Sequence, residues 1–504
     1  MSRVALTIAF LSLLAACGGA APSDTDTTTT DATATDASDP STTTATTTST
    51  PETTAGSDPT TDATTDVTMS TETTDSDATT DATDSDATTD TTDTGIDDCE
   101  PTLPTFADGK APTGALYVQA GAQPGGDGSQ GAPFDTLSAA LNAAGAGDEV
   151  RVSGQLAEGA YTVGLQGTDA APIWITGEPG AAIGRLTLES ASHVIVQDLE
   201  LIGTGDGHVL HFFFADHLMF RRLRIHDAGL GCIKGSQTSY AYVEDSELWA
   251  AGQMSSHPVL DYVGVNDGHI VRSRFHDGPE TMIMLKGGTS DMLFAWNEVY
   301  DQTAPGNALS LGQATGPQFF QPIDAAFEGL RIVAYANLLH DLVGAPVAFI
   351  GCKDCAAVHN TAWATTGLQL VRFLPGAAGE QSGLTQSVPE DCRFAGNILV
   401  GGQESGASLN ADAPNTGPGN VIDYNVFLKP GSLNWWGVIA QDMTHSTYDQ
   451  DPQLTGGGVP QNVALVDGAG PPDLDGVPFS RHFVRDFAGA CVTAPRDIGA
   501  IDVR

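Results

Sequence analysis

From residue 99 onward, short apolar segments alternate with turns rich in Gly and Asp, and one polar and apolar pattern returns at a nearly fixed interval. Aligning segments such as "RRLRIHD", "RSRFHDG" and "YANLLHD" defines an anchor column, with one residue from each repeat. Its members are Leu199, Leu223, Ser246, Ser273, Asn297, Asn337, Asn360, Asn397 and Asn425. The steps between them are 24, 23, 27, 24, 40, 23, 37 and 28 residues. This period predicts an all-β fold, a parallel β-solenoid with one coil per repeat and occasional insertions.

Two neighbouring columns support the same register. Two residues after the anchor, every repeat is apolar, and this column should point into the coil. It consists of Leu201, Ile225, Leu248, Phe275, Val299, Leu339, Ala362, Leu399 and Phe427. Beside the anchor, charge alternates from repeat to repeat in two columns, Glu200, Arg224, Glu247, Arg274, Glu298 and Asp198, Arg222, Asp245, Arg272. Because coils lie about 4.8 Å apart, opposite charges would stack directly and oppose slips in register.

The anchor column ends in five consecutive Asn residues, Asn297 to Asn425. This run resembles the asparagine ladder of right-handed parallel β-helix proteins of the pectate lyase-like superfamily. In such a ladder the amide bonds the next coil and tolerates unusual turn dihedrals. The stretch 114–161, with its Gly-rich loop and "GDEVRV", resembles the first part of these proteins, and "RDIGAID" resembles their closing segment. The resemblance implies a right-handed β-helix over residues 114–504, with a short helix near 136–144 capping its open end.

The first 17 residues, "MSRVALTIAFLSLLAAC", combine Arg3, an apolar run and small residues before Cys17. They resemble a bacterial lipoprotein signal peptide, which implies cleavage before Cys17 and diacylation of its thiol. An ordinary secretory signal with an incidental Cys is the alternative. No later segment approaches 18 uninterrupted apolar residues, so the lipid is expected to be the only membrane attachment. We therefore expect a lipid-anchored protein of the cell envelope, at the outer membrane or cell surface.

Residues 18–98 precede the domain and are almost entirely Thr, Asp, Ala and Ser, which predicts a disordered linker. They contain 19 acidic residues and no Lys or Arg. The domain, residues 99–504, carries 44 acidic and 19 basic side chains, a net charge of −25. This charge argues against nucleic acid as a partner, and against unaided binding of a polyanion unless cations bridge the two. We expect a monomer.

Six Cys residues remain after Cys17. Cys355 and Cys392 each lie five residues before an anchor Asn, so they should occupy the same place on successive coils. A Cα separation of about 4.8 Å lies within the range of disulfides. We predict a Cys355–Cys392 disulfide, with Cys352 as the main competitor for Cys392.

Three residues after the anchor stands a column of rings, which strand alternation turns outward. It consists of His226, Trp249, His276, Tyr300, His340 and Trp363. Exposed rings flanked by carboxylates are suited to binding sugars, whereas rings that only stabilise the solenoid wall are the alternative. The next column places Asp277, Asp301 and Asp341 on consecutive coils, which suggests a Ca²⁺ site. Alternatively, each Asp begins a turn.

A different face carries candidate catalytic residues. His211, Lys234 and Asp261 lie twelve residues before their anchors and Lys286 lies eleven before, so we predict a contiguous patch on four successive coils. A Lys whose pKa is lowered by burial or by a cation could abstract the proton α to a uronate carboxyl. The segment "ETMIMLKGGTSDMLFAWNEV" resembles the Lys-containing strand of some β-helix polysaccharide lyases, which implies that Lys286 is the base. Those lyases place an Arg about one coil later, where this chain reads "GNALSLGQATG" and leaves Arg372 on a later coil.

Two insertions, "QATGPQFFQPIDAAFEG" and "LPGAAGEQSGLTQSVPED", are expected to gather on one side of the solenoid. We therefore predict a β-helix domain that binds a polysaccharide and, as an enzyme, would cleave it by lyase or glycosidase chemistry. The alternative is a non-catalytic surface adhesin or structural β-helix protein.

Overall fold

The computed structural model describes residues 99, 103–403, 407–411, 415–431, 435–436, 443–492 and 494–503. They belong to one compact unit, Thr91–Arg504. Cys17 and the predicted linker lie outside them. None of the helices in the described ranges is long and apolar enough to cross a membrane.

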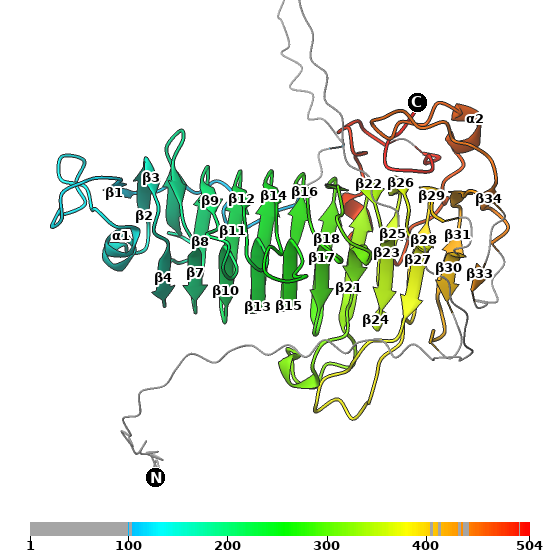
Figure 1. The fold of residues 1–504 in the computed structure, drawn as a ribbon, viewed down its shortest axis with the longest axis horizontal. Helices are drawn as coiled ribbons and strands as arrows, with labels where there is room; N and C mark the ends of the chain where they lie inside the picture. Colours follow the sequence, from blue (N-terminus) through cyan, green and yellow to red (C-terminus); the bar gives the residue numbers. More distant parts are fainter. Residues whose placement is uncertain are drawn as a thin grey trace, which may run out of the picture. The chain divides into compact units, whose positions relative to one another are not determined.

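The described residues form the predicted right-handed parallel β-helix, in which successive coils supply strands to three faces (Figure 1). Faces 1 and 2 belong to one 22-stranded sheet, because two 12-residue strands, β13 (Ile233–Glu244) and β15 (Leu260–Val271), bend from one face into the other. Face 3 is a separate 12-stranded sheet. Neighbouring strands within each face pair in parallel.

The remaining strands divide among the three faces. Face 1 also contains β4 (Ala160–Val163), β7 (Leu186–Glu189), β10 (Leu210–Phe213), β17 (Ile283–Lys286), β20 (Asn307–Leu311), β23 (Ala345–Ile350), β27 (Gln369–Leu374), β30 (Ala407–Ala411) and β33 (Trp435–Trp436). Face 2 also contains β1 (Gly114–Gln119), β2 (Asp148–Ser153), β5 (Ile173–Gly177), β8 (Ser192–Gln197), β11 (Asp216–Arg221), β18 (Thr289–Ala295), β21 (Gly329–Tyr335), β24 (Cys352–Lys353), β25 (Ala356–Val358), β28 (Arg393–Ala395) and β31 (Val421–Asp423). Face 3 contains β3 (Gln155–Leu156), β6 (Ala182–Ile183), β9 (Glu200–Ile202), β12 (Arg224–His226), β14 (Glu247–Trp249), β16 (Arg274–His276), β19 (Glu298–Tyr300), β22 (Leu338–Leu342), β26 (Thr361–Thr365), β29 (Ile398–Gly401), β32 (Val426–Leu428) and β34 (Thr447–Tyr448). The helices are α1 (Leu137–Ala143), α2 (Val463–Val466) and two 3-10 turns, η1 (Pro317–Phe319) and η2 (Ser480–His482).

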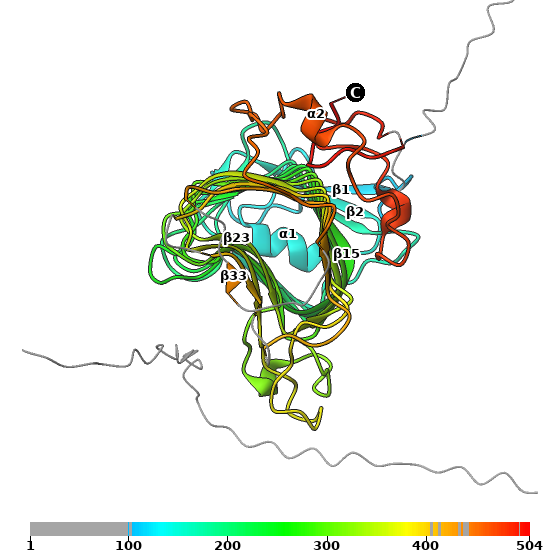
Figure 2. The ribbon, with the colours of Figure 1, turned by 90° about the vertical axis from the view of Figure 1, so that its right-hand side faces the viewer.

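The apolar core fills the interior of the coils. The predicted interior column is confirmed, because all nine of its side chains are at most 2 % exposed and belong to one core cluster. Seen end on, the strands surround this core and α1 lies across it (Figure 2). The hydroxyl of Thr136 accepts a hydrogen bond from the Ala139 N–H and begins the helix, which buries Leu137, Ala140 and Leu141.

The anchor column lies at the bend between faces 2 and 3. Each anchor Asn accepts a backbone N–H from the preceding anchor: Asn297 donates to Asn337 Oδ1 at 2.9 Å, and Asn360 to Asn397 Oδ1 at 2.8 Å. Ser273 does the same with its hydroxyl, accepting the Ser246 N–H at 3.1 Å. The unusual dihedrals belong to the residue before each anchor, with φ of 56° at Trp296, and not to the Asn itself. The ladder is therefore confirmed, and the expected location of the strained residue is corrected.

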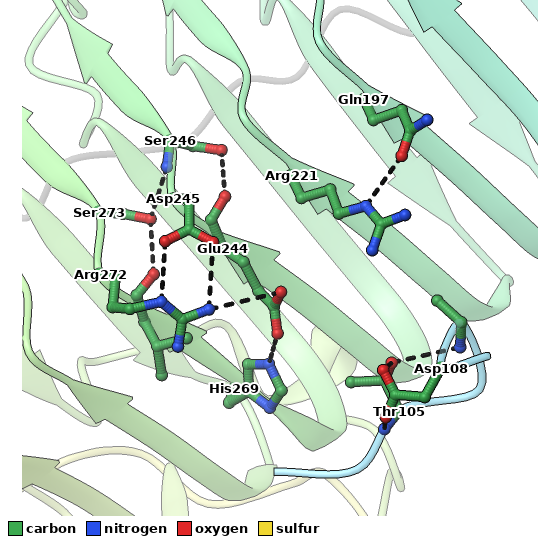
Figure 3. A network of polar contacts seen from close by, with 12 residues as sticks. Thr105, Asp108, Gln197, Arg221, Glu244, Asp245, Ser246, His269, Arg272 and Ser273 are labelled. Carbon is green, nitrogen blue, oxygen red and sulfur yellow. Dashed lines mark hydrogen bonds and ion pairs between the residues drawn. The ribbon is translucent and has the colours of Figure 1, made fainter. Parts of the chain in front are cut away.

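The alternating charges also pair as predicted. Arg272 Nε lies 2.8 Å from Asp245 Oδ1, and Arg224 Nη1 lies 3.0 Å from Glu200 Oε1 on the neighbouring coil. Figure 3 shows Arg272 reaching both Asp245 and Glu244, and Glu244 also meets His269. These pairs are largely exposed, so each contributes only about 0 to 1 kcal/mol and mainly fixes the register.

Parts of the outer side of face 2 are apolar, and terminal segments cover them. Phe483 stacks on Tyr335 with ring centroids 4.1 Å apart, and the Tyr335 hydroxyl donates to the Arg485 carbonyl at 2.8 Å. In the N-terminal segment that precedes the first strand, Phe106 packs among buried side chains of the early coils. A disulfide joins Cys99 to Cys491 across 392 residues of chain and thus links the two covering segments.

The predicted Cys355–Cys392 disulfide is not formed, and both residues are buried thiols. The register was right, since Ala356 pairs with Arg393 and the two Cys therefore stack on successive coils. The Cys392 sulfur, however, faces Cys352, with the Sγ atoms 3.6 Å apart, while the Cys355 thiol points to the Lys353 carbonyl. The competing residue, Cys352, thus contacts the Cys392 sulfur directly.

Candidate functional site

The four predicted catalytic residues lie together on the outer side of face 1. In the parallel register, His211 pairs with Lys234 and Lys234 pairs with Asp261. Lys286 pairs with Val263, two residues beyond Asp261, and its ammonium group reaches back to the same carboxylate. We call Lys234, Asp261 and Lys286 the lysine cluster.

Asp261 is the centre of the lysine cluster, and its side chain is only 5 % exposed. Lys234 Nζ lies 2.5 Å from Asp261 Oδ2, and Lys286 Nζ lies 3.7 Å from Oδ1. Burial alone would raise the pKa of this carboxyl, but the two ammonium groups outweigh burial and hold the pKa well below its usual range. Asp261 therefore stays ionised and positions both lysines, leaving Lys286 the more loosely held.

Histidines border the lysine cluster. The His208 ring lies 5.6 Å from that of His211 and 5.7 Å from that of His257. Burial, reinforced by Lys234, lowers the pKa of His208 to about 3, so its ring is neutral. Its Nδ1 accepts the Gly231 N–H at 3.0 Å, which leaves Nε2 as the protonated nitrogen. The sequence patterns did not select His208 or His257, although "HVLH" places His208 just before the strand of His211.

The two insertions lie together on one side of the solenoid, as predicted, and project between faces 1 and 2 (Figure 2). They contact each other through backbone hydrogen bonds, including Gly379 N–H to Ala325 O at 2.8 Å and Gln381 N–H to Ile323 O at 3.1 Å. Gln321 N–H donates to the carbonyl of Gly287, the residue that follows Lys286. The insertions therefore border the lysine cluster on one side.

Glu328 fixes this arrangement, and no pattern in the sequence indicated this role. Its fully buried carboxylate accepts N–H groups from Gly287 at 2.9 Å, Thr315 at 2.7 Å and Ala377 at 2.9 Å, and the Thr315 hydroxyl at 2.7 Å. Burial raises its pKa, and the four donors oppose that rise. Its partners are mostly backbone groups of non-repeating segments, which leave no pattern in the sequence.

The predicted column of rings is present, but on face 3. Its six rings stack in sequence, with centroid separations of 4.2 Å for His226–Trp249, 4.7 Å for His276–Tyr300 and 4.4 Å for His340–Trp363. Most of the ring faces therefore cover one another rather than meeting solvent. The structure does not bring this column together with the lysine cluster, and the stacking favours the alternative of a stabilised wall.

Asp277, Asp301 and Asp341 occupy left-handed turns, with φ between 50° and 52°. Asp277 Oδ2 lies 2.7 Å from the Nδ1 atom of His276, and Asp341 Oδ2 is equally close to that of His340. Over the described residues, the three carboxylates do not form a group of ligand atoms within reach of one ion. The arrangement fits the turn interpretation rather than a Ca²⁺ site.

Arg372 does not complete the lysine cluster. It lies in the outward column of Asp261, four coils farther along through Met284, Ser310 and Ala348. Four coils correspond to about 19 Å. Its guanidinium instead donates to Asn307 Oδ1 at 3.1 Å.

No protein-family model matches the chain, and no curated protein matches its sequence. Solved structures do share its fold. The complex of XylC with xylose superposes with a TM-score of 0.51 at 9% identity, covering 77% of this chain and 98% of that chain. Pectate lyase Pel9A gives 0.47 at 13% identity, covering 79% and 98%, and polygalacturonase from Erwinia carotovora ssp. carotovora gives 0.44 at 10%, covering 68% and 98%. At these identities the likeness shows the β-helix fold alone.

Proposed function

We propose that face 1 binds an acidic polysaccharide and cleaves it as a lyase, with the lysine cluster acting on a uronate unit. The observation that carries the proposal is the single buried carboxylate of Asp261 shared by Lys234 and Lys286. It holds two amines on one exposed face of a domain that is otherwise strongly acidic. A uronate carboxylate would find complementary charge there. That the structurally similar XylC holds xylose is consistent with a carbohydrate ligand.

The two lysines can take different roles in a β-elimination. One carboxylate cannot fully compensate two ammonium groups, so we assign proton abstraction to Lys286, the more distant one at 3.7 Å. Lys286, as the free amine, would take the proton from the carbon next to the uronate carboxyl. The electron pair of that C–H bond would form the carbon–carbon double bond, and the bond to the glycosidic oxygen would break as that oxygen takes a proton from water. Lys234, held at 2.5 Å by Asp261, would stay charged and stabilise the developing carboxylate charge. The product carries a carbon–carbon double bond.

Hydrolysis by a glycosidase is a poorer fit. Glycosidases use two carboxyl groups on either side of the scissile bond. The cluster holds one carboxylate, and that one is buried between two ammonium groups that keep it ionised. It is therefore badly placed to act as either a general acid or a nucleophile.

A non-catalytic adhesin is the second candidate. It is favoured by the ion pairs of both lysines with Asp261 and by the distance to Arg372, which instead binds Asn307. Face 1 would then hold the polysaccharide through charge and leave it intact.

Incubating the full chain with a panel of acidic and neutral polysaccharides, with and without Ca²⁺, separates the candidates. Ultraviolet absorbance from unsaturated products supports the lyase, and new reducing ends without absorbance would indicate a hydrolase. Binding of a polysaccharide without cleavage would support the adhesin. Lys286→Met should abolish cleavage, whereas Lys353→Met, which removes a lysine on face 2, should not. Equal loss of cleavage in Lys286→Met and Lys353→Met, or no binding to any acidic polysaccharide, would reject the proposal.

We further propose that the domain is exported and tethered through a lipid on Cys17. The motif around Cys17 supports this proposal. Metabolic labelling with a radioactive fatty acid should mark the wild-type chain and not Cys17→Ser. Labelling of both chains, or of neither, would contradict it.

A further inference from the structure

A second polar cluster lies on face 2, away from the lysine cluster, where β8 and β11 begin. In the parallel register, Ser192 pairs with Asp216 and Val194 pairs with Leu218. His193 and His217 lie between these pairs, in left-handed conformations with φ of 51° and 50°. Neighbouring coils therefore place the two histidines directly over each other.

Aromatic side chains hold the two imidazoles in place. The rings of His193 and His217 are parallel within 6°, with centroids 4.3 Å apart. Tyr240 stacks on His217 at 4.3 Å. Phe106 stands perpendicular to both imidazoles, at 5.5 and 5.7 Å. These contacts set the direction in which the ring nitrogens point.

The Nδ1 atoms of both rings face Asp216. Asp216 Oδ1 lies 2.9 Å from His217 Nδ1 and 3.8 Å from His193 Nδ1. The Ser192 hydroxyl lies among them, 2.7 Å from Asp216 Oδ1 and 2.8 Å from His193 Nδ1. Across the described ranges, this is the one group of three His, Cys, Asp or Glu ligand atoms that all lie within 4.8 Å of one another.

We propose that His193, Asp216 and His217 bind a divalent transition-metal ion of the zinc type. Zinc binds imidazole nitrogen and carboxylate oxygen at about 2.0 to 2.2 Å in a tetrahedron, which places ligand atoms about 3.4 Å apart. The nitrogen-to-oxygen distances of 2.9 and 3.8 Å lie on either side of that value. Two imidazoles with one carboxylate select zinc, cobalt or nickel over calcium, which takes oxygen ligands. Water or the Ser192 hydroxyl would fill the fourth position.

Binding requires a small local change. Two parallel rings cannot both aim their in-plane lone pairs at one ion, so the imidazoles must tilt toward each other. Because Phe106 contacts both rings, the ion would also stiffen the N-terminal segment on face 2. Figure 3 shows Thr105 and Asp108 of that segment, which are joined to each other by hydrogen bonds. The site would therefore tie this segment to two coils.

The test uses the metal-free full chain, equilibrium dialysis with Zn²⁺, and Co²⁺ as a spectroscopic probe. We expect one tightly bound ion, a Co²⁺ visible spectrum typical of nitrogen and oxygen ligands, and imidazole ¹⁵N shifts that report coordination through Nδ1. His217→Gln and the isosteric Asp216→Asn should each weaken binding at least about 100-fold. Far-ultraviolet circular dichroism checks that both variants fold.

Two matched variants control for other histidines. His276→Gln removes a histidine that also contacts a neighbouring carboxylate, Asp277 at 2.7 Å, and His257→Gln removes one beside the lysine cluster. Both should retain the tight site. The proposal is overturned if the wild-type chain shows no tight zinc, or if His257→Gln loses it while folded His217→Gln and Asp216→Asn keep it. Weak binding that is equal in all variants would belong to acidic residues elsewhere and would also overturn it.

Discussion

Glu328 and Gly287 are joined at the turn that follows Lys286, where the buried Glu328 carboxylate accepts the Gly287 backbone N–H at 2.9 Å. The same carboxylate accepts N–H groups of Thr315 and Ala377, one from each insertion. One buried side chain thus fixes both insertions to the turn beside the lysine cluster. The position of Lys286 depends on a residue that never needs to touch a substrate.

Replacing Glu328 with Gln should loosen both insertions, because the amide NH₂ would face backbone donors. A buried hydrogen-bonding group left unpaired costs about 1 to 3 kcal/mol, and we expect the free energy of unfolding to fall by about that amount. Hydrogen exchange at the amides of Gly287, Thr315 and Ala377 should accelerate. Glu178→Gln, at an exposed position, is the control and should change neither quantity. Slow exchange at all three amides in Glu328→Gln would contradict the assigned role.

Replacing Asp261 with Asn should destabilise the domain, because two ammonium groups would then lie close together without a counter-charge. Removing one partner of a buried ion pair costs about 3 to 5 kcal/mol near neutral pH. The folded-state pKa of Asp261 is lowered, so its stabilisation is present above the unfolded value of 3.8 and is lost as pH falls through the folded pKa. Urea unfolding should therefore show a gap between wild type and variant that narrows below about pH 4. Asp169→Asn breaks an exposed pair with Lys110 and should cost only about 0 to 1 kcal/mol. A pH-independent gap would be evidence against the assigned ion pairs.

The periodic sequence predicts the features that follow from the register of one coil over the next. Counting from the anchor placed Lys234 and Asp261 on paired positions, and it put Cys355 over Cys392, because every coil returns the chain to the same point. The direction of a thiol within that register was not encoded, and Cys392 turned toward Cys352. Spacing likewise located the column of rings. It could not show that rings one coil apart are close enough to cover each other's faces.

Features outside the repeat could not be predicted from the sequence. Cys99 and Cys491 lie in terminal segments with no place in the period, so nothing indicated that they meet. Glu328 acts through backbone N–H groups of the insertions, which any residue type can supply. His193 and His217 do lie within the repeat, each six residues before its anchor, but they precede the segments that were aligned, and their stacking was not predicted.

His340 should make stability depend on pH. Burial lowers its pKa, but hydrogen bonds to Glu298 and Asp341 outweigh burial, and the folded pKa is raised above 6.5. The folded state therefore binds this proton more tightly, so the stabilisation is complete below the unfolded pKa and is lost as pH rises through the folded one. In His340→Phe, which keeps a ring in the stack, the loss of melting temperature should be larger at about pH 5 than at about pH 8. Tyr300→Phe in the same stack should show no such difference.

Oxidation should join Cys352 to Cys392. Their sulfurs need to close only from 3.6 Å to a bond length of about 2.05 Å, whereas the Cys355 thiol is directed at the Lys353 carbonyl. Peptide mapping after mild oxidation should recover a Cys352–Cys392 peptide from wild type and from Cys355→Ser. Cys352→Ser should yield Cys355–Cys392 instead. Recovery of a Cys355–Cys392 peptide from the wild-type chain would contradict this prediction and support the pairing expected from the register alone.

The anchor ladder should tolerate Ser but not Ala. Asn360 Oδ1 accepts the Asn337 N–H at 3.0 Å, so Asn360→Ala leaves this buried backbone donor without its acceptor, whereas Asn397 Oδ1 still accepts the Asn360 backbone N–H. We expect a loss of about 2 to 3 kcal/mol in the free energy of unfolding. Asn297→Ser should cost clearly less, because Ser273 already accepts an anchor N–H through its hydroxyl at 3.1 Å. Denaturant unfolding of both variants measures the difference. Equal losses would mean that the side-chain volume at the bend, rather than the acceptor for the backbone N–H, is what the ladder requires.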